Sequence, residues 1–306
     1  MDYAFVKGIL LEISVQNVIQ GSLMLIVKVL VLKDLNFFWC VFINIRINYF
    51  VEFTKILLTT GHYLTFTDLI STLLIDLDGT CNVDLPNYPK ALRGATGNFA
   101  NDMILICGGK MVKYGYINEC YKLSKGGKSF DTFQAMSENR GWASSAVIND
   151  QNIWITGGKN ENSTHGTTEF INSSTIFCGV NLPEPIDHHI IISLNSTTSF
   201  LIGGFIDDVS SDKTYYFNHE NNIWIEGPYL NGPRAMHTAG VIKDHITHLE
   251  HVVVAGGSID GLVNNLNSVE ILFNNQNYWS KGTYKGLIVI CTSTMKIGII
   301  KDLVHT

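Results

Sequence analysis

The sequence predicts an all-β protein that is assembled from repeats. Short apolar runs alternate with turn-forming residues along most of the chain, which has 27 Gly but only 6 Pro in 306 residues. Gly and Asn tolerate the positive φ values of tight turns, and many turns between short apolar runs are typical of β-strands. A strand that ends in Gly-Gly recurs at intervals of about 50 residues, which indicates a repeat array.

The composition is that of a folded protein with little charge. Hydrophobic residues make up 46% of the chain, charged residues make up 16%, and the formal net charge is −6. This balance excludes a disordered chain. No basic cluster is interleaved with aromatic residues, so we expect no nucleic-acid partner.

Each repeat is recognised first by its glycine-ending strand. The strands are KILLTTG, which is the weakest copy, then MILICGG, NIWITGG, SFLIGG and HVVVAGG. Their glycines are Gly61, Gly108, Gly109, Gly157, Gly158, Gly203, Gly204, Gly256 and Gly257. A strand with a large residue follows each one, and a further aromatic residue follows in four of the five. These positions hold Ile75, Tyr121, Phe170, Phe217 and Phe273, and then Phe130, Phe177, Trp224 and Trp279.

An arginine marks the start of several repeats. Arg93, Arg140 and Arg234 precede strands of small residues, whereas LPEPIDHHII occupies the same place without an arginine. Each repeat therefore reads as four short strands: one of small residues, one ending in Gly-Gly, one with Tyr or Phe, and one with Trp or Phe.

This pattern resembles the kelch repeat over residues 55–285. The resemblance implies a β-propeller in which each repeat is a four-stranded blade. Its glycines would allow close approach of the backbone at the inner edge, and its aromatic residues would fill the space between blades. Five repeats are visible. We expect six blades or an incomplete six-bladed ring, and the alternative is five blades closed by the strand GLIVICT at 286–292.

The two ends of the chain do not carry the repeat. Residues 286–306 are expected to form a C-terminal strand or tail. Two interpretations remain open: this segment closes the ring, or residues 1–54 or 286–306 form a degenerate sixth blade. Residues 1–54 are apolar, and three interpretations remain open: a signal segment starting at Met24, additional strands, or an N-terminus that is not the natural one. We expect this segment to be poorly integrated with the propeller. Membrane insertion is disfavoured because charges interrupt its apolar runs, at Glu12, Lys28, Lys33, Asp34 and Arg46.

One short stretch resembles an enzyme motif. Ile75-Asp76-Leu77-Asp78-Gly79-Thr80 is similar to the first motif of the haloacid dehalogenase family, in which the first Asp is a nucleophile. The repeat register instead places Asp76 at the end of a strand, and no helical periodicity follows. We therefore expect no catalytic role for Asp76.

Histidine and cysteine residues give no metal or catalytic signal. His245, His248 and His251 are spaced by three and are expected in a solvated loop, while His188 and His189 are expected to pack. No C-x-x-C spacing occurs among Cys40, Cys81, Cys107, Cys120, Cys178 and Cys291. Buried thiols remain as open an interpretation as a disulfide in a secreted protein. Three N-glycosylation sequons begin at Asn162, Asn172 and Asn195, and they matter only in the secretory pathway.

The resemblance implies a non-catalytic protein-binding module without catalytic residues, metal or cofactor. The expected partner surface is the set of loops that follow the Gly-Gly doublets, at 110–119, 159–168, 205–213 and 258–268. Its candidate residues are Lys110, Tyr114, Tyr116, Asp207, Asp208 and Asp260. Alternatives are the substrate-recognition propeller of a ubiquitin ligase adaptor that lacks its dimerisation domain, an extracellular kelch protein, and an enzyme on a kelch scaffold. The sequence leaves cytoplasmic and secreted locations open.

Overall fold

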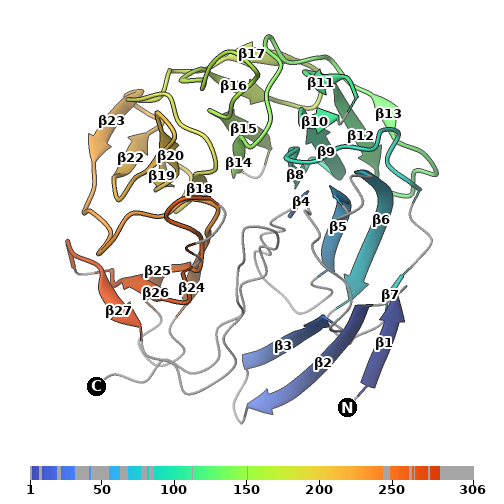
Figure 1. The fold of residues 1–306 in the computed structure, drawn as a ribbon, viewed down its shortest axis with the longest axis horizontal. Helices are drawn as coiled ribbons and strands as arrows, with labels where there is room; N and C mark the ends of the chain where they lie inside the picture. The colour runs from blue at the N-terminus through green and yellow to red at the C-terminus, as the bar shows by residue number, and fades with distance from the viewer. Residues whose placement is uncertain are drawn as a thin grey trace.

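The computed structural model describes residues 2–6, 9–18, 22–31, 41–42, 55–62, 68–76, 81–82 and 86–282, apart from 112, 150, 244–248, 262–263, 265 and 275. All helix and strand elements in these ranges are β-strands, which confirms the all-β prediction. Five four-stranded sheets follow one another along the chain and form an arc in Figure 1.

Each of these sheets is an antiparallel meander. The first contains β4 (Val41–Phe42), β5 (Lys55–His62), β6 (Asp68–Asp76) and β7 (Cys81–Asn82). The second contains β8 (Thr96–Ala100), β9 (Met103–Cys107), β12 (Cys120–Ser124) and β13 (Asp131–Thr132). The third contains β14 (Ser144–Ile148), β15 (Asn152–Thr156), β16 (Thr168–Ile171) and β17 (Ile176–Cys178).

The last two sheets repeat this arrangement. The fourth contains β18 (Ile190–Ser193), β19 (Thr198–Ile202), β22 (Thr214–Asn218) and β23 (Ile223–Glu226). The fifth contains β24 (Thr238–Lys243), β25 (Glu250–Ala255), β26 (Val269–Leu272) and β27 (Ser280–Gly282). Two small hairpins, β10 (Lys110–Met111) with β11 (Gly115–Tyr116) and β20 (Phe205–Ile206) with β21 (Val209–Ser210), follow Gly-Gly doublets.

The apolar N-terminal segment contributes to two different sheets. β1 (Asp2–Val6), β2 (Ile9–Val18) and β3 (Ser22–Val31) form a three-stranded sheet of their own. β4 lies in the same segment but pairs with β5, because Val41 and Phe42 are opposite Thr59 and Leu58. The first four-stranded sheet therefore begins before residue 55.

Asp76 is the last residue of β6 and lies opposite Lys55 in an antiparallel pair. Asp76 therefore ends a strand of an antiparallel sheet, whereas a dehalogenase requires a parallel sheet. Gly61 lies inside β5 at a register irregularity rather than at the end of the strand. The expected closing strand at 286–292 and the rest of 286–306 lie outside the described residues.

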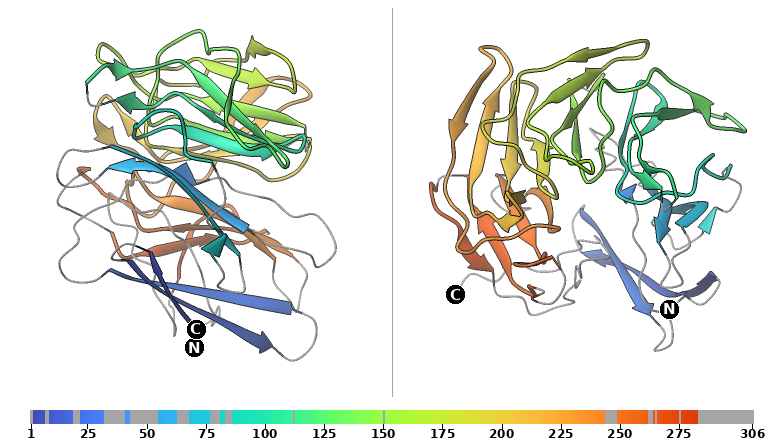
Figure 2. Two further views of the ribbon diagram at one scale, coloured as in Figure 1. Left: turned by 90° about the vertical axis from the view of Figure 1, so that its right-hand side faces the viewer. Right: turned by 45° about the horizontal axis from the view of Figure 1, so that its top comes forward.

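The four-stranded sheets stand side by side along the arc (Figure 2). Apolar clusters fill the spaces between successive sheets. Large side chains on the facing sides of neighbouring sheets belong to the same cluster, so burial depends on stacking of the sheets. Leu105 and Ile153 pack between the second and third sheets, and Trp154 and Phe217 between the third and fourth. Phe200 and Trp279 pack between the fourth and fifth sheets.

Trp154 is the centre of an aromatic group between the third and fourth sheets. Its ring centroid lies 4.7 Å from that of Phe217, 5.2 Å from that of Phe170 and 5.6 Å from that of Trp224. The Trp224 indole also donates a hydrogen bond to the carbonyl of Asn181 across 2.8 Å. The aromatic positions of the repeat therefore act in packing between sheets.

The first strand of each sheet contacts the first strand of the next, from β4 and β8 through β14 and β18 to β24. Serines of β14 connect these strands. The Ser145 hydroxyl accepts hydrogen bonds from Thr96 (2.9 Å) and Asn98 (2.8 Å) of β8, and the Ser144 hydroxyl accepts one from the Ile191 N–H of β18 (3.0 Å). Small polar residues in the first strand thus permit close approach along the inner side of the arc.

The Gly-Gly doublets of the second, third and fourth sheets join each of these sheets to the loop that enters the next one. The N–H groups of Gly109, Gly158 and Gly204 donate to the carbonyls of Arg140, Ile186 and Arg234 at 2.8–2.9 Å. All eight glycines of the four doublets have positive φ. A Cβ added at Gly108 would lie 2.3 Å from the Arg140 carbonyl oxygen, so a side chain at this site would prevent the contact.

These contacts correct the arginine register of the repeat. Arg140, Ile186 and Arg234 are equivalent, because each accepts a hydrogen bond from a doublet. Arg93 pairs with Lys110 as Gly141 pairs with Lys159, so Arg93 is equivalent to Gly141. The residue before Arg93, which is Leu92, is therefore the equivalent of Arg140 in the second sheet. The prediction that Arg93 marks this position was wrong by one residue. His188 and His189 likewise do not replace the arginine, because Ile186 occupies its place.

The two arginines at this position are buried and paired. Arg140 donates to the Gly157 carbonyl (2.9 Å) and to the carboxylate of Glu169 (3.0 Å), while Arg234 contacts the Gly256 carbonyl and Glu270 in the same way. Burial lowers the pKa of each arginine, and the paired carboxylate opposes that effect.

An apolar residue and a tyrosine replace this ion pair in the second and fourth sheets. Tyr121 and Tyr215 occupy the strand positions of Glu169 and Glu270, because each lies opposite the second-to-last residue of the strand before Gly-Gly. Leu92 shares an apolar cluster with Tyr121, and Tyr215 packs against the cluster that contains Ile186. From the second sheet to the fifth, the sheets therefore alternate between an apolar–tyrosine pair and an arginine–glutamate pair.

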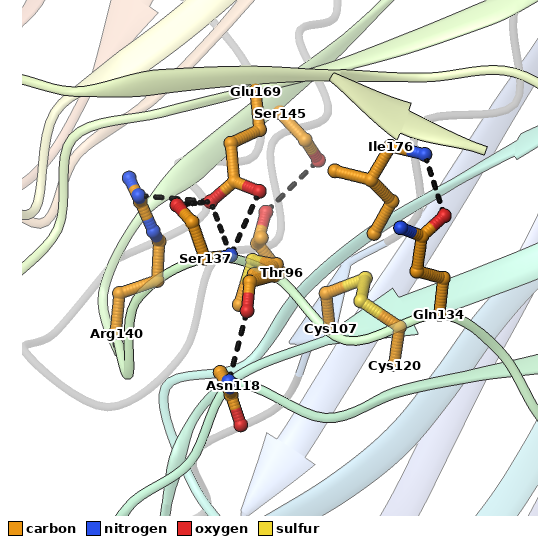
Figure 3. Close-up of a disulfide and its surroundings, with 11 residues drawn as sticks. Thr96, Cys107, Asn118, Cys120, Gln134, Ser137, Arg140, Ser145, Glu169 and Ile176 are labelled. Atoms are coloured by element: carbon orange, nitrogen blue, oxygen red, sulfur yellow. Dashed lines mark hydrogen bonds and ion pairs between the residues drawn. A yellow bond between two sulfur atoms is a disulfide. The ribbon is translucent and has the colours of Figure 1, made fainter. Parts of the chain in front are cut away.

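The second sheet contains a disulfide between adjacent strands (Figure 3). Cys107 in β9 lies opposite Cys120 in β12, with 4.1 Å between their Cα atoms, and both residues are buried. Cys178 is an exposed free cysteine. Cys40 and Cys291 lie outside the described residues. The structure thus decides between the two interpretations of the cysteines for one pair.

Replacing Cys107 and Cys120 together by alanine is expected to lower the free energy of unfolding by about 3 kcal/mol. The bond closes a short loop, with a sequence separation of 13, and so restricts the unfolded chain. Urea denaturation of the oxidised protein and the double variant measures the difference. Cys178→Ala is the matched control and should leave the midpoint unchanged. Equal midpoints for all three proteins would contradict the prediction.

The histidines near β25 differ from the expected loop. His251 is buried in β25, where its ring lies 5.0 Å from Phe273 and its Nδ1 accepts a hydrogen bond from the Asn274 N–H. The solvated-loop prediction was therefore wrong for His251. His245 and His248 lie outside the described residues.

Candidate functional site

The four loops after the Gly-Gly doublets lie at one end of the sheets, because the second strand of each sheet ends there. We call this end the loop face and define it by the described residues of 110–119, 159–168, 205–213 and 258–268. In the second and fourth sheets, the loop folds into a hairpin. In the third, Lys159 bridges to Thr164, and in the fifth, the Ile259 N–H donates to the Asn264 carbonyl.

Neighbouring loops contact one another across the loop face. The Tyr116 N–H donates to the Glu161 carboxylate at 3.2 Å, which joins the first loop to the second. Lys159 Nζ lies 3.5 Å from Asp208 Oδ1, which joins the second to the third. A Cβ at Gly261 would lie 3.3 Å from the Phe205 ring, so the third and fourth loops are also in close contact. The loops therefore form one continuous surface.

A chain of backbone hydrogen bonds connects the bases of these loops. The N–H of Trp142 donates to the Gly94 carbonyl, that of His188 to the Trp142 carbonyl, and that of Met236 to the His188 carbonyl, at 2.7–3.0 Å. All four residues have positive φ, between 52° and 65°. This conformation is uncommon in residues other than glycine, and its recurrence in four successive sheets shows that one backbone geometry is required there.

Ring stacking continues along the same bases. The Trp142 ring stacks on His188 at 5.2 Å and meets Tyr116 edge-on at 5.4 Å, while His188 meets Phe205 edge-on at 5.5 Å. Burial, together with the carboxylates of Glu161 and Asp187, raises the pKa of Tyr116 to about 12, so this phenol stays neutral.

Asp187 is a fully buried carboxylate beneath the loops. It contacts His188 Nδ1, and Lys159 Nζ lies 3.3 Å from its other oxygen. Burial by itself raises the pKa of Asp187, but the hydrogen bond with His188 and the charge of Lys159 outweigh burial, so the pKa lies below its ordinary value. Asp187 thus stays ionised and anchors Lys159, which reaches Asp208 at the surface.

The six predicted loop residues fall into two groups. Tyr114, Asp207 and Asp208 are exposed, and the two aspartates have φ of 49° and 60° in the turn between β20 and β21. Such values are typical of a two-residue hairpin turn. The other three contact their own loops: Tyr116 is buried, Lys110 Nζ lies 4.6 Å from the Tyr116 ring centroid, and Asp260 accepts from the Asn264 N–H.

Three exposed apolar side chains lie on the loop face, one on each of three loops. Tyr114 and Val209 are each 68% exposed, and Ile259 is 43% exposed. Charged side chains lie beside them, because Lys113 Nζ is 5.4 Å from the Tyr114 ring and the exposed Asp208 precedes Val209. Exposed apolar side chains with charged neighbours are typical of a surface that binds another protein.

Sequence reasoning found the loops but missed Val209, Ile259, Lys159, Glu161 and Asp187. The last three interact between loops, and such partners are distant in sequence. The sequence did contain a signal for Val209, because this residue directly follows the Asp207-Asp208 turn.

No group of three His, Cys, Asp or Glu side chains in the described part of the chain is arranged to hold a metal ion. The described residues also include no helix long and apolar enough to span a membrane. No protein-family model matches the chain, and a search of curated proteins gave no match.

Proposed function

We propose that this chain is a kelch-type β-propeller whose loop face binds a protein partner without catalysing a reaction. The observation that carries the proposal is the exposure of Tyr114, Val209 and Ile259 on three of the four loops of the loop face. The cost of leaving these side chains in water is removed when a partner covers them.

The propeller is supported by the repeat and by the way in which the sheets meet. The N–H groups of Gly109, Gly158 and Gly204 each link one sheet to the loop that enters the next, and first strands contact each other around the arc. A radial arrangement satisfies both relationships with one geometry. We propose a ring of six blades, or an incomplete six-bladed ring, to which the terminal segments contribute.

The partner is inferred to be a protein from the chemistry of the loop face. A tyrosine and two branched aliphatic side chains supply large apolar contacts, and Lys113, Asp207 and Asp208 supply charges at their edge. Interfaces of this kind take most of their binding free energy from a few central side chains, while the rim adds specificity.

One observation favours an extracellular kelch protein over a ubiquitin ligase adaptor. The buried Cys107–Cys120 disulfide belongs to an oxidising environment, whereas such adaptors work in the reducing cytosol. An extracellular protein uses the loop face in the same way, so the proposed binding site does not change.

Partner capture by matched variants tests the proposal. The immobilised full chain is compared with two variants. The loop-face variant carries Tyr114→Ala, Val209→Ala and Ile259→Ala. The β23 control carries Ile223→Ala and Ile225→Ala. The control residues are exposed on β23, away from the loop face. Bound proteins are identified by mass spectrometry, and their affinities are measured with the purified partner.

We expect the loop-face variant to lose at least about tenfold in affinity and the β23 control to bind like the parent protein. Melting temperatures are measured on all three proteins, because substitution of exposed residues should change stability little. The loop face is not the partner site if the loop-face variant binds the partner as tightly as the parent protein does, or if only the β23 control loses binding.

A further inference from the structure

We propose that Asn172 and Asn195 carry N-linked glycans and that the chain folds in the secretory pathway. Two independent observations lead to this inference: the location and geometry of the two sequons, and the disulfide in the second sheet.

Both asparagines lie in short turns at the surface. Asn172 begins the turn between β16 and β17, where its N–H donates to the Thr175 carbonyl. Asn195 lies in the turn between β18 and β19, where its N–H donates to the Thr198 carbonyl. An acceptor asparagine must tolerate a bulky polar group, and surface turns meet that requirement.

The two sequons share the same local geometry. Asn195 Oδ1 accepts hydrogen bonds from the Thr197 N–H (2.9 Å) and hydroxyl (3.0 Å), and Asn172 Oδ1 accepts from the Ser174 N–H (2.9 Å) and hydroxyl (3.2 Å). These bonds use only the amide oxygen. The amide nitrogen, which would carry the sugar, can therefore be modified without loss of the turn.

The third sequon differs in geometry and in position. The Thr164 hydroxyl, at the third position of the Asn162 sequon, donates to Asp187 at 3.4 Å instead of to the asparagine. Asn162 also belongs to the loop face. The turns of Asn172 and Asn195 lie at the opposite end of the sheets, because each follows or precedes a strand at the end away from the Gly-Gly doublet. The proposal is confined to Asn172 and Asn195, where glycans leave the loop face uncovered.

The disulfide provides the second observation. Disulfides persist in the secretory pathway and outside the cell, and they are rare in the cytosol. The same compartment supplies the lipid-diphosphate-linked glycan that modifies asparagine. In this reaction, a bond forms between Asn Nδ2 and the anomeric carbon, the bond from that carbon to the diphosphate oxygen breaks, and the amide releases one proton. The lipid diphosphate is the leaving group.

Expression of the full chain behind a cleavable secretory leader in a eukaryotic host tests the proposal. Enzymatic deglycosylation converts each glycan-bearing Asn to Asp, which mass spectrometry then locates. Ser174→Ala and Thr197→Ala destroy one sequon each. Ser173→Ala and Ser196→Ala are the matched controls, since they change the neighbouring residue and keep the sequon.

We expect Asn-to-Asp conversion at both positions, loss of one site in each sequon variant, and no loss in either control. If the chain is not secreted, translation with microsomal membranes gives the same readout on the nascent chain, where conversion at both positions is again expected. Unmodified Asn172 and Asn195 in the translocated chain would overturn the proposal. Free thiols at Cys107 and Cys120 in the secreted protein would also overturn it, because the disulfide is its second basis.

Discussion

Arg140→Leu is expected to destabilise the protein by about 3–5 kcal/mol, and adding Glu169→Tyr is expected to restore much of that loss. The single substitution leaves the Glu169 carboxylate buried without its guanidinium partner. The double variant reproduces the combination of Leu92 with Tyr121 that the second sheet already contains. Urea denaturation of the two single variants, the double variant and the parent completes a double-mutant cycle.

Lys125→Leu is the control, because it removes an ion pair at the surface instead of a buried one. Lys125 Nζ lies 3.7 Å from Asp102, but both side chains are largely exposed, so the expected cost is about 0–1 kcal/mol. The interpretation of the alternating pairs fails if the double variant is no more stable than Arg140→Leu alone.

Trp154→Ala is expected to reduce the free energy of unfolding by about 3–5 kcal/mol. The side chain is fully buried between the third and fourth sheets, and its loss would remove contacts with Phe170, Phe217 and Trp224 together. Trp224→Ala should cost less, because the Trp224 side chain is only partly buried. Thermal melting followed by circular dichroism measures both effects.

Tyr278→Ala serves as the aromatic control for this comparison. Tyr278 is 57% exposed, so its removal should barely change the melting temperature. A Trp154→Ala protein that melts with the parent would show that the aromatic group does not hold neighbouring sheets together.

Many elements of the fold were predictable from local sequence. The four strands of a repeat follow from short apolar runs and turns, and the Gly-Gly doublets require positive φ, which few other residues adopt. The register of the arginine was not predictable in the same way. Arg93 and Leu92 are neighbours, and only the contact of each doublet with the following loop shows which of them matches Arg140.

The candidate site was predictable as a set of loops but not as a surface. The position of a loop after Gly-Gly places it at one end of a sheet, and hairpin turns expose Asp207 and Asp208 there. The sequence did not distinguish Tyr114, which is exposed, from Tyr116, which is buried two residues later. That difference depends on Trp142 and Glu161, which come from other parts of the chain.

By itself, the sequence determined the all-β class, the repeat period and the strand order, because these depend on the properties of adjacent residues. The tertiary structure alone decided which cysteines pair, that β4 joins the first four-stranded sheet, and that Asp187 lies buried between His188 and Lys159. Each of these relationships joins residues through strand register or contact between neighbouring loops. Such contacts are set by the free energy of packing the whole chain, so no local pattern specifies them.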